Sequence, residues 1–229
     1  PHGDTSMTQY AILGMWEAGD GAGLNVPRKA WDDAAQWLVK TQNGDGGFVY
    51  HPVERKESTH TMAVASLGSL YICRDHLGGK RRSARGGLLQ AVQDEEEKKE
   101  GSFKSSTTPG QIDDAIKKAT GWLTSHFTLD KGTGETDSGG GRFLLYYLYA
   151  FERFATLADL KLINGVDWYA EGSKIVLAKQ QPDGSWNVGD GAEASTAFAV
   201  LFLVRSTHIS KIIHDRRLGR GTLVSGRGL

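Results

Sequence analysis

A seven-residue pattern, Gln-x-x-Asp-Gly-x-aromatic, occurs twice in this chain. Its fixed positions are Gln42, Asp45, Gly46 and Phe48 in the first copy, and Gln180, Asp183, Gly184 and Trp186 in the second. Each copy follows an apolar segment with helical spacing, so the Asp-Gly pair predicts the end of a helix and a tight turn. We expect the glutamine to bond backbone groups left open at the end of a neighbouring helix, and the aromatic ring to pack over the turn. The pattern therefore predicts helical hairpins joined into a repeat fold.

Apolar residues alternate between two arrangements along the chain. Segments that are apolar on most sides predict inner helices at residues 5–18, 62–73, 143–151 and 194–204. Segments with one apolar stripe opposite charged residues predict outer helices at residues 27–39, 112–123 and 166–179. This alternation predicts an all-α fold with two concentric layers of helices.

Two stretches depart from the alternation. Residues 78–111 are rich in charged residues, serine and threonine, and are expected to form a solvated insertion within a repeat domain that spans residues 1–206. A partner-docking loop is the alternative for this insertion. Residues 207–229 are basic and lack apolar periodicity, so they are expected to form a linker or tail.

Charge and cysteine content restrict the function. The 27 basic residues balance the 27 acidic ones, which gives no support for nucleic acid as a partner. The single cysteine, Cys73, excludes an intramolecular disulfide and is expected to be buried. No uninterrupted apolar segment of about twenty residues occurs, so no transmembrane segment is expected. The chain starts at Pro1 without a methionine, so we expect a piece of a longer protein, and the compartment stays open.

The two motifs, each preceded by an outer helix that carries aromatic residues, resemble the QW repeats of squalene and oxidosqualene cyclases. They are similar, more broadly, to the repeats of protein prenyltransferase β subunits. The likeness covers about residues 4–206. It implies an α/α toroid, here a partial barrel of repeated helical hairpins. It does not imply one activity, because this fold hosts cyclases, prenyltransferases and thioester proteins.

The catalytic signatures that the resemblance implies are absent from the sequence. No Asp-x-Asp-Asp acid and no thioester motif occur. The pairs Asp32-Asp33 and Asp113-Asp114 are expected on the solvated faces of outer helices. Cys73, Asp75 and His76 are the residue types of a prenyltransferase zinc site, but they cluster at one helix end instead of being spread over separate repeats. No metal or cofactor is therefore expected.

Polar residues just before the inner helices form the remaining candidate site. In a toroid these helix ends meet at one mouth of the barrel, where a ligand-binding cleft is plausible. The candidate residues are Asp4, Thr8, Gln9, His60, Asp137, Arg142, Tyr146 and Glu193, with Thr61, Ser195 and Thr196 beside them. The competing interpretation is that the acidic residues only cap helices, and that Tyr146 belongs to the core.

Two functional hypotheses follow. The first is a non-catalytic module of a larger protein that binds a hydrophobic small molecule, a peptide or other domains of its parent chain. The second is a terpenoid cyclase or prenyltransferase-type enzyme acting on an isoprenoid lipid, with its catalytic acid or metal site outside this chain. The missing signatures favour the module.

Overall fold

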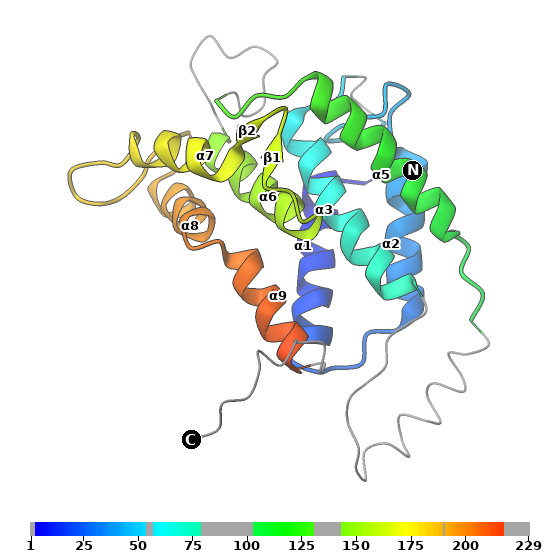
Figure 1. Cartoon of the computed structure of the whole chain (residues 1–229). Helices are drawn as coiled ribbons and strands as arrows, with labels where there is room; N and C mark the ends of the chain where they lie inside the picture. The colour runs from blue at the N-terminus through cyan, green and yellow to red at the C-terminus, as the bar shows by residue number, and fades with distance from the viewer. Residues whose placement is uncertain (1–2, 54–56, 79–102, 131–142, 190, 218–229) are drawn as a thin grey trace.

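The computed structural model describes residues 3–53, 57–78, 103–130, 143–189 and 191–217 (Figure 1). The predicted all-α class is confirmed, because helices packed on one another make up most of this part of the chain. The helices are α1 (Thr5–Trp16), the π-helical turn η1 (Glu17–Gly21), α2 (Arg28–Thr41), α3 (His60–Leu77), α5 (Pro109–Ser125), α6 (Leu144–Leu157), α7 (Trp168–Leu177), α8 (Ala192–Leu203) and α9 (Ser206–Arg217). A short antiparallel pair, β1 (Leu162–Ile163) and β2 (Val166–Asp167), precedes α7.

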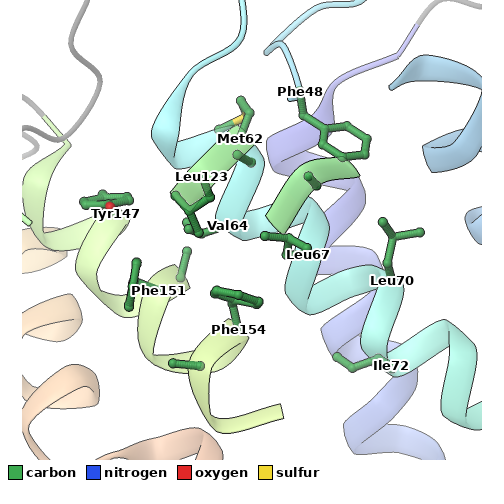
Figure 2. Close-up of a cluster of buried hydrophobic side chains, with 14 of the residues drawn as sticks. Phe48, Met62, Val64, Leu67, Leu70, Ile72, Leu123, Tyr147, Phe151 and Phe154 are labelled. Atoms are coloured by element: carbon green, nitrogen blue, oxygen red, sulfur yellow. The ribbon is translucent and has the colours of Figure 1, made fainter. Parts of the chain in front are cut away.

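The predicted inner helices pack side by side in the order of the chain. Helix α1 contacts α3, α3 contacts α6, and α6 contacts α8. Helix α3 lies at the centre and is buried along most of its length, because α1, α2, α5 and α6 all pack against it. Figure 2 shows part of this core, where Val64 and Leu67 of α3 lie near Leu123 of α5 and the rings of Phe151 and Phe154 of α6.

The outer helices α2 and α5 have one buried face each, as their sequence pattern predicts. Trp31, Ala35 and Leu38 of α2 are buried, and the stripe of α5 from Ile112 to Leu123 is buried likewise. A capping box between Thr108 and Gln111 begins α5. Helix α5 therefore starts inside the predicted insertion, whose residues 79–102 lie outside the described part of the chain.

Asp32 corrects the prediction that both acidic residues of its pair face solvent. It is buried, and its carboxylate accepts hydrogen bonds from the backbone N–H groups of Ser106 and Thr107 at 2.8 and 3.0 Å, and from the hydroxyls of Ser105 and Ser106. Burial alone raises the pKa of a carboxyl, but these hydrogen bonds outweigh it and lower the pKa of Asp32 to about 2. Asp32 thus fixes the segment that leads into α5.

Helix α1 is less buried than its composition predicts. Met7 and Tyr10 are exposed, while Thr5 and Gln9 are buried beside Ile12 and Trp16. The polar Gln9 faces the core because polar groups of α6 meet it there, as described below. Helix α1 passes directly into η1.

The end of the chain also differs from the prediction. Residues from 207 were expected to form a linker, but α9 packs against α6 and η1 and buries Thr207 and His214. Residues 218–229 lie outside the described part of the chain. No single described helix is long and apolar enough to cross a membrane; α8 and most of α9 meet that test only together, and they are bent by 56°.

Candidate functional site

The two motif copies form the same turn. Gln42 and Gln180 each donate from Nε2 to the carbonyl oxygen of their motif glycine, at 2.8 and 2.9 Å. Gly46 and Gly184 take positive φ angles of 93° and 87°, which glycine adopts without steric cost. The motif aspartate accepts a hydrogen bond from the backbone N–H two residues later, at 2.9 Å in the first copy and 3.0 Å in the second. The predicted tight turn is therefore confirmed in both copies.

The motif aromatic is buried in both copies. Phe48 is fully buried, and Trp186 is buried with its Nε1 donating to the carbonyl oxygen of Val176, 2.7 Å away, near the end of α7. The backbone N–H of Trp186 donates to the hydroxyl of Thr196 at 3.0 Å. Thr196 and Ser195, predicted near a cleft, instead join α8 to this turn, because the Ser195 hydroxyl accepts from the backbone N–H of Val188 at 3.1 Å.

The two turns differ in what covers them. Gln42 also donates to the carbonyl oxygen of Ala115 in α5, at 2.9 Å. A Cβ atom at Gly46 would lie 2.9 Å from the carbonyl oxygen of Lys118, so the turn packs closely on the backbone of α5. Ala115 lies inside α5, so the predicted bond to a helix end is wrong in that detail. The glutamine joins two helices by reaching a carbonyl along the helix side.

The second turn has no described helix in the place that α5 takes on the first. Gln180 is exposed, and the nearest atom to a Cβ at Gly184 would be the amide nitrogen of Gln180 itself, 4.0 Å away. Leu177, three residues before Gln180, is 55% exposed, whereas Val39, three residues before Gln42, packs against the core.

Helix α8 shares this exposure. It was predicted to be an inner helix, and Ser195, Ala199 and Phe202 are buried, but Val200 is 45% exposed and Val204 is also exposed. Val200 lies one helical turn beyond Thr196, which contacts the second motif. We call the exposed residues of the second motif region and of α8, namely Leu177, Gln180, Gly184, Val200 and Val204, the open edge.

Four of the predicted cleft residues lie together, at the start of α1 and on α6. Asp4 caps α1 by accepting from the backbone N–H of Met7 at 2.9 Å, and the hydroxyl of Thr8 donates to the carbonyl oxygen of Asp4 at 2.8 Å. Gln9 donates to the hydroxyl of Tyr146 and accepts from Nη1 of Arg153 at 2.6 Å. The side chains of Gln9, Tyr146 and Arg153 thus form a buried network, whereas those of Asp4 and Thr8 bond the backbone at the start of α1.

Tyr146 is held as a neutral phenol in this network. Burial raises its pKa to about 12, and a hydrogen bond with the Ser6 hydroxyl at 3.0 Å and the charge of Arg153 only reduce that rise. Its ring stacks on Tyr10. The arrangement fits the interpretation that Tyr146 belongs to the core and Asp4 caps a helix.

The remaining predicted cleft residues have different surroundings. Nε2 of His60 lies 2.5 Å from the carbonyl oxygen of His126, and its ring contacts Trp122 and Tyr147. Glu193 is exposed in the first turn of α8, and Thr61 is buried in α3. Asp137 and Arg142 lie outside the described residues.

A separate cleft of about 290 Å³ lies where η1, α3 and α9 end. Its lining includes Asp20, Asp75, His214 and Asp215, and His76 Nε2 lies 3.6 Å from the Asp20 carboxylate. In the sequence, Asp75 and His76 stand beside Cys73 as the residue types of a zinc site. No sequence pattern connects them with Asp20, which lies in a glycine-rich segment. Cys73 is buried, and burial raises the pKa of its thiol to about 12.

No protein-family model, curated protein or solved structure matches this chain.

Proposed function

We propose that this chain is a non-catalytic helical repeat module that binds an amphipathic α-helix at the open edge. One contrast carries this proposal. The first motif turn bonds the backbone of α5 through Gln42, whereas the exposed side chain of Gln180 bonds, within the described part of the chain, only its own turn.

The two motif turns occupy equivalent positions between helices. Helices α2 and α3 enclose the first turn, and α5 packs on both of them. Helices α7 and α8 enclose the second turn in the same order along the chain. An amphipathic helix that lies over α7 and α8 would cover Leu177 and Val200 and bring a backbone carbonyl to Gln180.

The contacts of α5 indicate what such a partner helix needs. Small residues allow close approach, and α5 presents Ala115 and Ala119 in its buried stripe. An outer helix from another repeat has this character, so the partner is another repeat unit, as expected for a domain of a longer parent chain. The resemblance to squalene cyclase and prenyltransferase repeats supports this assignment through the shared geometry of the two turns. The alternative, an enzyme acting on an isoprenoid lipid, stays a prediction.

A helical peptide with the sequence of residues 107–127 tests the proposal, because it reproduces α5 and its capping box. We expect the labelled peptide to bind the chain with a Kd in the micromolar range, measured by fluorescence anisotropy. Val200→Asp should weaken binding at least about tenfold, because it places a charge in an apolar contact. The same substitution at Leu162, which is also exposed but lies on β1, is the matched control and should leave the Kd unchanged.

A second peptide, with Ala115 and Ala119 both replaced by glutamate, should not bind. Equal binding by both peptides, or equal binding by the Val200→Asp and Leu162→Asp variants, would contradict the proposal. Self-association of the chain that Val200→Asp abolishes, without peptide binding, would show that the open edge pairs with a second copy instead.

A further inference from the structure

The cleft beside η1 lies where three helices end. Asp20 belongs to η1, Asp75 and His76 to the last turn of α3, and His214 to the last turn of α9. The carboxyl end of a helix carries partial negative charge and leaves carbonyl groups unbonded, so such ends attract cations. This cleft shares no residue with the open edge.

The chain already places cations at two of these ends. The guanidinium of Arg28 donates to the carbonyl oxygen of Leu77 at 3.0 Å, at the end of α3. The guanidinium of Arg217 donates to the carbonyl oxygens of Gly21 and Ala22, at the end of η1. The negative ends of these helices are thus stabilised by positive charge from elsewhere in the chain.

Three side chains in this region have the geometry of metal ligands. One atom each of Asp20, Asp75 and His76 lies within 4.8 Å of the other two. Asp20 and His76 are buried, while Asp75 is exposed and leaves the group accessible from solvent. The ring of His76 stacks on Trp31 with 3.7 Å between ring centroids, which fixes its orientation. Asp20 sits in a π-helical turn, a feature frequent at functional sites.

His214 provides an independent observation. It is 3% exposed and lines the same cleft, and its buried Nδ1 has no hydrogen-bond partner among the residues that the structure describes. Its Nε2 lies 3.1 Å from the carboxylate of Glu17. A carboxylate on one ring nitrogen favours the tautomer that leaves a lone pair on the other, which is the usual arrangement of a histidine beside a metal.

The charges around the cleft agree with a cation. The cleft lining has three carboxylates, Asp20, Asp75 and Asp215, and two basic residues, Arg74 and Lys211. The charge of Arg74 is partly balanced by Asp113, with which its guanidinium pairs at 3.2 Å, and the guanidinium lies over the ring of Tyr71, another lining residue.

From this arrangement we infer that Asp20, Asp75 and His76 bind a divalent transition-metal ion of the Zn²⁺ class, with His214 Nδ1 as the acceptor for water bound to it. Two carboxylates and an imidazole suit zinc or cobalt better than magnesium or calcium, which prefer oxygen ligands alone. The ion joins η1 to α3. This set differs from the group of Cys73, Asp75 and His76 that stands out in the sequence. Asp20 takes the place of Cys73, which is buried and is not among the grouped ligands.

Cobalt binding to the chelator-treated chain tests this site, because Co²⁺ bound by nitrogen and oxygen ligands absorbs visible light. We expect stoichiometric Co²⁺ binding that Zn²⁺ reverses and Mg²⁺ at the same concentration does not. Asp75→Asn should raise the Co²⁺ Kd at least about tenfold, and since Asp75 is exposed the variant should fold. Asp114→Asn removes an exposed carboxylate of α5 that is outside the group, and it should leave the Kd within about twofold of the original.

His76→Phe adds a second test, since it keeps a ring on Trp31 but removes the nitrogen ligand. We expect it to abolish the visible absorption. The inference is overturned if Co²⁺ does not bind, if Mg²⁺ competes equally, or if Asp75→Asn and His76→Phe bind Co²⁺ as tightly as the unchanged chain.

Discussion

The side-chain amide nitrogen of Gln42 lies 2.9 Å from the carbonyl oxygen of Ala115 and joins α2 to α5 across 73 residues of sequence. The same nitrogen bonds the carbonyl oxygen of Gly46. Gln180 makes only the second kind of bond among the described residues, with Gly184. The two glutamines thus form a natural comparison between a covered turn and an uncovered one.

Gln42→Ala and Gln180→Ala should differ in their effect on stability. Both variants lose the bond within the turn, but only Gln42→Ala loses the bond to α5. We expect the free energy of unfolding to fall by about 1 kcal/mol more for Gln42→Ala than for Gln180→Ala. Urea unfolding of the two variants measures this difference, and equal losses would mean that the bond to Ala115 contributes nothing.

Trp186→Ala should lower the free energy of unfolding by about 3 to 5 kcal/mol, because it removes a large buried ring and its hydrogen bond to Val176. Trp186→Phe keeps a ring of the kind that Phe48 supplies in the first copy. It should cost only about 1 kcal/mol for the lost hydrogen bond and some packing. An unchanged unfolding midpoint for Trp186→Ala would contradict the packing role of this residue.

Asp32 should make stability depend on pH. Its pKa is about 2 in the folded chain and about 3.9 in an unfolded one, so its stabilising contribution is present above pH 4 and is lost as the pH falls toward 2. Asp32→Asn should therefore lower the free energy of unfolding by about 2 kcal/mol at pH 7, with a smaller difference near pH 2.5. Asp33→Asn, which affects only an exposed pair with Lys29, is the control and should change stability little. A pH-independent difference between Asp32→Asn and the unchanged chain would contradict the role of these hydrogen bonds.

Cys73 should be inert in the folded chain. It is fully buried in α3, and burial raises its pKa to about 12, so little thiolate is present at neutral pH. We expect its alkylation at pH 8 to be at least about 100-fold slower than in urea-unfolded chain. Rapid alkylation under native conditions would show that α3 is accessible at this point.

Local sequence patterns were sufficient to predict the inner and outer helices and both motif turns, but not η1 or α9. The stripe from Ile112 to Leu123 and the apolar run of α3 determine which faces are buried. The Asp-Gly pairs at Asp45 and Asp183 form the turns that follow α2 and α7. Helix α9 escaped prediction because the residues that it buries are the polar Thr207 and His214, which give no apolar stripe in the sequence; its apolar Ile209 and Ile213 are exposed.

The candidate sites depended on contacts that no local pattern contains. The burial of Asp32 requires donors about seventy residues away, in a polar segment that looked solvated. The group of Asp20, Asp75 and His76 combines a glycine-rich turn with the end of α3. The open edge depends on the difference between the surroundings of Gln180 and those of Gln42, which belong to two copies of the same local pattern.

Hydrogen–deuterium exchange with and without the peptide of residues 107–127 tests the central proposal most directly. We predict that bound peptide protects the backbone amides of residues 177–188 and of α8, and leaves the first turn at residues 42–48 unchanged, because α5 already covers it. Two results would contradict the assignment of the open edge as a helix-binding surface. One is protection confined to another part of the chain, and the other is altered protection at residues 42–48, which would mean that the peptide displaces the chain's own α5.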